Sequence, residues 1–138
     1  MSQTEHILKV FLCHAHADSA SVRALYNYLL RNGVEAWLDN EELEAGQDWE
    51  YEIRKAIRNS DVVVICLSQQ FSQRGYRQKE LRIALDEAMR IPEGQIFIIP
   101  VRLDECDVPV SLRRWQWVDL FKAGGYSKLL RAIRRVRF

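Results

Sequence analysis

Two apolar runs without polar interruption limit what this chain can fold into. One spans residues 62–67 and begins Val62-Val63-Val64-Ile65, and the other spans residues 96–101. A strand with one face in water alternates apolar and polar residues, whereas a strand buried on both faces does not. Strands of the second kind belong to parallel sheets that are covered by helices. We therefore predict that both runs are central strands of such a sheet.

The rest of the chain alternates between strand-like and helical segments. Further strands are expected at residues 7–13, 34–38 and 115–120, and helices at residues 76–90 and 126–136. Two more helices are expected to begin after Asp18 and Asp48, which are suited to be N-caps. This alternation implies right-handed crossovers. The predicted fold class is α/β, a flavodoxin-like, doubly wound, five-stranded parallel sheet with helices on both faces.

Size and charge exclude several classes of protein. The 138 residues suit one domain, for which we expect residues 7–138, preceded by a flexible N-terminus at residues 1–6. Twenty basic and nineteen acidic residues leave a net charge of +1, which argues against nucleic acid as a partner. Basic residues gather near the C-terminus, where we interpret them as the solvated face of a last helix, or else as a contact for an acidic partner: Lys128, Arg131, Arg134, Arg135 and Arg137.

The sequence also points to the reducing cytoplasm. No apolar run approaches the length of a membrane span, and the first residues do not resemble a signal peptide, so no membrane partner is predicted. The three cysteines are Cys13, Cys66 and Cys106, an odd number without the spacing of a metal site. Two of them lie in apolar runs, where a thiol behaves as a small hydrophobe.

Ligands of a doubly wound sheet bind at the carboxyl ends of its strands. In this chain the loops at that edge are residues 14–18, 39–47, 68–75 and 102–111. The first loop contains no glycine, so neither a dinucleotide-binding glycine motif nor a phosphate-binding P-loop is present. The clustered acids of a phosphoacceptor receiver domain are missing as well.

Four segments, in order and at consistent separations, carry a family resemblance. They are Phe11-Leu12-Cys13-His14, residues 34–47, residues 61–68, and Gly75-Tyr76-Arg77-Gln78-Lys79-Glu80-Leu81. They resemble the first strand, the second strand with its functional loop, the third strand and the catalytic segment of the Toll/interleukin-receptor (TIR) domain family. The similarity covers nearly the whole chain and is to the bacterial-type members that cleave NAD+.

The resemblance implies a single catalytic residue, Glu80. Cleavage of the bond between nicotinamide and ribose needs no general acid, because the leaving group is already cationic. It needs an acceptor that holds the ribose hydroxyls and stabilises the oxocarbenium charge. Tyr76 lies one helical turn before Glu80, so its ring is expected beside the carboxylate and able to stack on the ligand. Many catalytic relatives have tryptophan at this position.

The helix that carries Glu80 is expected to have two faces. Its predicted buried stripe consists of Leu81, Ala84, Leu85 and Ala88. Its predicted separate face, which includes the catalytic position, consists of Tyr76, Glu80, Ile83 and Glu87. Without the resemblance, Glu80 would be interpreted as an ordinary surface glutamate.

Five other residues are candidates for binding the substrate. Trp49 is a candidate because the second loop of the family often places an aromatic beside the ligand, although its spacing favours a core anchor. His14 and His16 lie where relatives have residues that reach phosphates, or they are surface histidines. Asp39 and Glu44 order the second loop, or they are solvated acids. No metal ligand set is predicted.

The preferred function is therefore an NAD+ glycohydrolase, a hydrolase that releases nicotinamide and ADP-ribose or a cyclised form. NAD+ is expected as substrate, with no cofactor, and other TIR domains as partners in self-assembly during signalling or immune defence. One alternative is a non-catalytic TIR interaction module. A weaker alternative is a sensor that holds NAD+ without cleaving it.

Overall fold

Five parallel strands form the sheet of this protein. The structure is a computed structural model that describes residues 7–38, 44–71, 77–92 and 95–136, without the side chains of residue 16 and residues 77–80. The strands are β1 (Lys9–Cys13), β2 (Glu35–Leu38), β3 (Val62–Leu67), β4 (Ile98–Arg102) and β5 (Val118–Asp119). Their order is β2-β1-β3-β4-β5, and every neighbouring pair is parallel. The predicted sheet is confirmed.

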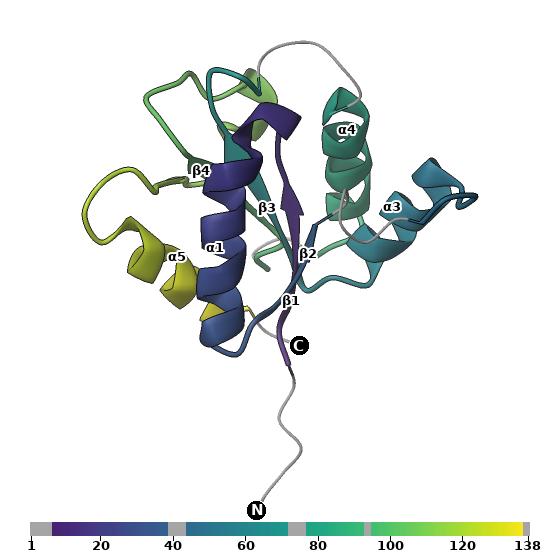
Figure 1. The fold of residues 1–138 in the computed structure, drawn as a ribbon, viewed down its shortest axis with the longest axis horizontal. Helices are drawn as coiled ribbons and strands as arrows, with labels where there is room; N and C mark the ends of the chain where they lie inside the picture. The colour runs from purple at the N-terminus through teal and green to yellow at the C-terminus, as the bar shows by residue number, and fades with distance from the viewer. Residues whose placement is uncertain (1–6, 39–43, 72–76, 93–94, 137–138) are drawn as a thin grey trace, which may run out of the picture.

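Helices cover both faces of the sheet. In the described part of the chain they are α1 (Ser19–Arg31), α3 (Trp49–Arg58), α4 (Arg77–Ala88) and α5 (Gly125–Arg134), with short 3₁₀ turns η1 (His16–Asp18) and η2 (Val110–Leu112). Figure 1 shows α1 and α5 on one side of the sheet and α3 and α4 on the other. This arrangement is the doubly wound fold that the sequence predicts.

Strand β3 divides the hydrophobic core into two layers. Val62, Val64 and Cys66 belong to the layer that also contains the buried side of α1 and α5. Residues 63, 65 and 67 belong to the other layer, with the buried side of α3 and α4. All six residues of β3 are at most 1% exposed. The absence of polar alternation in this run is therefore explained by burial on both faces.

The two predicted N-caps have different outcomes. The Asp48 carboxylate accepts a hydrogen bond from the backbone N–H of Tyr51 at 3.0 Å, which caps α3 as expected. Asp18 occupies the N-cap position of α1, as predicted, but its side chain makes no capping hydrogen bond. Its carboxylate is used in a contact between two loops, which is described below.

Helix α4 is buried more broadly than its sequence suggests. Leu81 and Ala84 are buried as predicted, but Ile83 and Glu87 are buried too, at 4% and 6% exposure. Ile83, which the sequence leaves as core or partner surface, joins the core layer of α3 and α4. Glu87 tolerates burial because Arg58, on α3, forms an ion pair with it.

The remaining boundaries shift by a few residues. Strand β4 begins at Ile98, and β5 consists of Val118–Asp119 alone. The basic residues of α5 and the turn after it, from Lys128 to Arg135, have exposed side chains, as the sequence predicts. None of the described helices has both the length and the apolar character needed to cross a membrane.

Candidate functional site

The topology places the expected ligand site between two strands. β1 and β3 are neighbours in the sheet, yet the chain leaves them toward opposite faces, through α1 and α4 respectively. Such a switch in direction separates the loops that follow the two strands, which is where ligands of doubly wound sheets bind. Figure 1 shows α1 and α4 starting on the side of the molecule where β1 and β3 end.

A hydrogen bond joins the two loops across this switch point. The Ser68 hydroxyl, which directly follows β3, donates to the Asp18 carboxylate, which follows β1. The same oxygen accepts the backbone N–H groups of Gln70 at 3.0 Å and Phe71 at 3.2 Å. Ser68 is 4% exposed and Phe71 is 2% exposed. One buried hydroxyl therefore fixes the start of the loop that leads to α4.

The loop after β4 adds a second set of contacts to this edge. The backbone N–H of Gln69 donates to the Asp104 carboxylate at 3.4 Å, and its side-chain amide donates to the Glu105 carbonyl at 3.4 Å. Arg102 donates to both oxygens of Asp119, at 2.7 and 3.1 Å, and to the Cys106 carbonyl at 2.9 Å. These bonds tie the carboxyl ends of β3, β4 and β5 together.

The surroundings of the ionisable groups near this edge keep a carboxylate ionised and two thiols neutral. Hydrogen bonds from Arg102 lower the pKa of Asp119, so this carboxylate stays ionised. Burial raises the pKa of Cys66 far above its ordinary value and that of Cys106 to about 11. Both thiols are therefore neutral near pH 7 and unsuited to nucleophilic attack.

The predicted catalytic residue lies in the first turn of α4. Glu80 is the fourth residue of that helix, which starts at the end of the sheet where β1 and β3 end. The side chain of Glu80, the side chain of His16 and the whole of Tyr76 lie outside the described residues. The predicted grouping of these residues with His14 in one concavity stays a prediction.

The other predicted site residues have different surroundings. His14 directly follows β1 and is 3% exposed, so it is not the surface histidine that the alternative interpretation required. Trp49 begins α3, is partly buried and packs against the core layer of α3 and α4, which fits a core anchor. Glu44 is exposed, and its backbone N–H donates to the Gln47 side chain at 2.7 Å. Asp39 lies outside the described residues.

Sequence reasoning missed the link between Asp18 and Ser68. The sequence suggests an N-cap role for Asp18 and gives no role to Ser68. The signal that identifies the pair is topological, because both follow strands that are adjacent in the predicted sheet. Side chains at that position are within reach of each other although 50 residues separate them.

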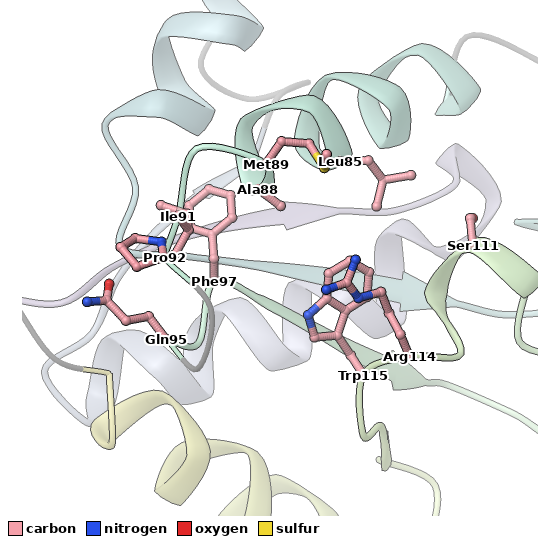
Figure 2. A pocket seen from close by; sticks show the side chains of 10 residues that line it. All are labelled: Leu85, Ala88, Met89, Ile91, Pro92, Gln95, Phe97, Ser111, Arg114 and Trp115. Carbon is pink, nitrogen blue, oxygen red and sulfur yellow. The ribbon is translucent and has the colours of Figure 1, made fainter.

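The cavity in Figure 2 has a mixed polar and apolar lining and lies away from this edge. It has a volume of about 550 Å³ and lies between the second half of α4, the segment before β4 and the turn after η2. Leu85, Ala88 and Phe97 form part of its wall, and Arg114 and Trp115 stand at its other side. It contains none of the predicted site residues. Among the described residues, no group of His, Cys, Asp or Glu side chains is arranged to hold a metal ion.

The fold defines a doubly wound parallel α/β domain, in which a ligand is expected at the switch point between β1 and β3. Comparison with known families shows which family of doubly wound domains the chain belongs to. A family model described as TIR domain matches residues 10–134. The chain therefore belongs to the TIR domain family, as the sequence resemblance indicates.

One curated relative carries a name that refers to an activity. It is the NAD(+) hydrolase TcpA of Theionarchaea archaeon (strain DG-70-1), which is 32% identical over 93 residues. The match covers 67% of this chain but only 27% of the length of that relative.

Solved structures support the fold. The TIR domain of the Toll-related receptor TRR-2 from Hydra magnipapillata has a TM-score of 0.76 and 24% identity, and covers 91% of this chain and 98% of its own. The TIR domains of the activated Roq1 resistosome have a TM-score of 0.63 and 23% identity, over 92% of this chain and 70% of that one. A TIR-STING receptor from C. gigas has a TM-score of 0.79 and 18% identity, over 99% and 42%.

Proposed function

We propose that this domain is an NAD+ glycohydrolase with Glu80 as its catalytic residue. The observation that carries the proposal is the similarity to a relative named as an NAD(+) hydrolase. The position of residue 80 supports it, because the first turn of α4 is close to the switch point where doubly wound sheets bind ligands.

The reaction requires little from the protein beyond orientation and charge. The bond between the ribose anomeric carbon and the nicotinamide nitrogen breaks, and its electron pair leaves with nicotinamide, which becomes neutral. Water then attacks the anomeric carbon and loses a proton, which gives ADP-ribose. An internal nucleophile in place of water gives a cyclised product. In both cases positive charge develops on the ribose as the bond breaks.

Glu80 acts on that charge. Its carboxylate accepts hydrogen bonds from the ribose hydroxyls and stabilises the developing oxocarbenium ion. Tyr76, one turn earlier in the chain, supplies a ring for stacking on nicotinamide or ribose. His14, His16, Trp49, Asp39 and Glu44 remain the proposed surroundings of the substrate.

The contacts of Ser68 explain how the edge is kept in place for this chemistry. Ser68 anchors the beginning of the segment between β3 and α4, and Asp18 anchors Ser68. Position 80 lies one turn before Ala84 and two turns before Glu87, both of which are buried. The packing of α4 therefore restricts how far its first turn moves relative to the sheet.

The test is nicotinamide release from NAD+ by concentrated protein. We expect release by the native chain and a loss of at least about 100-fold in Glu80→Gln, because the substitution removes the negative charge and keeps the shape. Asp86→Asn is the matched control, since Asp86 is an exposed acid on the same helix. No release by native protein at any concentration, with the fold intact, would instead support a non-catalytic interaction module.

A further inference from the structure

A second cavity lies between the start of β4, strand β5 and helix α5. Its volume is about 720 Å³, which falls within the range of sites for small molecules. We call it the α5 groove. It is lined by Gln95, Ile96, Ile98, Ile99, Arg114, Trp115, Gln116, Trp117, Val118, Lys128, Arg131, Ala132 and Arg135. Because β4 begins at Ile98, the groove lies at the amino end of that strand, opposite the edge that carries Ser68.

The charge of the α5 groove has one sign. Its four charged residues are Arg114, Lys128, Arg131 and Arg135, all with exposed side chains. No acid is among the described residues that line it. Arg134 on the same helix is directed elsewhere, since its guanidinium donates to the Asn32 carbonyl at 3.1 Å. The four cations therefore attract an anion without a neutralising neighbour in the groove.

The groove also offers flat apolar surface beside the charges. Trp117 is 39% exposed, a large fraction for an indole. Trp115 is partly buried, and the Arg114 guanidinium lies 4.8 Å from its ring centroid. Figure 2 shows these two side chains beside each other. Beneath α5 the groove is floored by Ile99 and Val118, which belong to the core layer of α1 and α5 and are 4% and 7% exposed. A ring that enters the groove thus meets both an indole and an aliphatic surface.

We propose that the α5 groove binds a nucleotide, with its phosphates on the cations and its base against Trp117. A free phosphate would use the cations but leave the exposed indole of Trp117 in water. A nucleotide satisfies both parts, because a base stacks on an aromatic side chain and phosphates pair with arginine and lysine. The site is separate from the edge with Glu80 and does not depend on NAD+ cleavage.

The experiment uses ADP as probe and the indole N–H signals of ¹⁵N-labelled protein as readout. The chain has four tryptophans, so each indole reports on its own surroundings. We expect ADP to shift the signals of Trp115 and Trp117 and to leave that of Trp37 in place. Pyrophosphate and adenosine, tested separately, are each expected to bind more weakly than ADP. Raised salt is expected to weaken ADP binding.

Two variants locate the binding. Lys128→Gln combined with Arg131→Gln is expected to weaken ADP binding by about tenfold or more, because two charge-assisted contacts are lost. Arg134→Gln is the matched control and is expected to bind like the native chain. These substitutions are at exposed side chains, and the indole spectrum without ADP reports whether the fold is intact. Arg114→Gln, on a different segment of the groove, is an independent variant.

Three results would overturn the proposal. One is the absence of any shift at Trp115 and Trp117 with millimolar ADP, and another is equal ADP affinity in the double variant and in Arg134→Gln. The third is a double variant that changes self-association while native protein binds no ADP. That result would assign the groove to an acidic segment of a second copy.

Discussion

Glu87 is a charged side chain that the fold buries and then neutralises. Arg58 donates to both of its carboxylate oxygens, at 2.9 and 3.4 Å, and Arg90 lies 3.9 Å from one of them. The hydrogen bonds from Arg58 are the main cause that lowers the pKa of Glu87 below its ordinary 4.5. Because the folded pKa is the lower one, this interaction stabilises the fold above pH 4.5 and is lost as the pH falls through the lowered value.

Glu87→Gln should therefore lower the free energy of unfolding at neutral pH and make that free energy fall less steeply as the pH becomes acidic. We expect the free energy of unfolding at neutral pH to fall by about 1 kcal/mol, since Arg58 is half-exposed and water screens part of the pair. Urea unfolding at neutral pH and at about pH 3 measures both effects. Glu50→Gln, which removes an exposed pair with Arg54, is the control and should change little. Identical acid sensitivity of native protein and Glu87→Gln would contradict the prediction.

Ser68→Ala tests the link across the switch point. The substitution removes the donor to Asp18 and the acceptor of two backbone N–H groups, so we expect a loss of about 1–3 kcal/mol in unfolding free energy. Hydrogen exchange at the amides of Gln70 and Phe71 should become faster. Ser60→Ala removes one hydroxyl bond, to the Ala56 carbonyl at 2.7 Å, and should cost less. If Ser60→Ala costs as much and exchange is unchanged, the link has no special role.

The sequence predicts where these residues lie along the fold better than it predicts the contacts and burial of their side chains. Asp18 was placed correctly in the first loop, but whether its carboxylate caps a helix or accepts from Ser68 depends on which loop lies opposite. His14 gave no sign of its burial, because a histidine after a strand is equally common at a surface. Glu87 needed a partner 29 residues away, which periodicity within one helix does not reveal.

The sequence predicts helices and strands better than side-chain contacts, because the patterns that indicate them are local and repeated. Every residue of β3 is apolar because both faces of the strand are buried, so the sequence predicts the limits of the strand to within one residue. β5 has only two residues and pairs through Val118 and Asp119 alone, so a longer strand was expected there. The burial of α4 is broader than the stripe that an ideal helical period predicts, because Ile83 lies outside that stripe and still joins the core.

Gly125 determines how α5 meets the sheet. It is buried at the start of that helix, and a Cβ placed there would press against the Asp119 carbonyl and lie 2.8 Å from the Leu120 Cα. Both contacts are with backbone, which gives way less readily than a side-chain end. We expect Gly125→Ala to lower the free energy of unfolding by about 1–3 kcal/mol, measured by urea unfolding. Ser127→Ala, at an exposed position of the same helix, should be close to neutral, and equal effects would contradict the packing argument.

At the scale of the whole molecule, we propose that NAD+ cleavage by this domain depends on its self-assembly. The described end of the second loop is a fixed turn, in which Gln47 N–H donates to the Glu44 carbonyl at 3.1 Å and Gly46 has φ +91°. A proline substituted for Gly46 would break this turn, because proline requires a negative φ. Substitution of Glu44, whose side chain is exposed, is therefore a better test of contacts between copies than substitution of Gly46.

We predict that nicotinamide release per molecule rises with protein concentration and falls with salt. The physical reason is that contact with a second domain orders the second loop around NAD+, and contacts between surface charges are screened by ions. The measurement is specific activity across a dilution series at low and high ionic strength, with association followed by sedimentation. Glu44→Gln should reduce the salt dependence, whereas Glu35→Gln, an exposed acid at the start of β2, should not. Constant specific activity down to dilutions at which only monomers sediment would show that one domain is sufficient for the reaction.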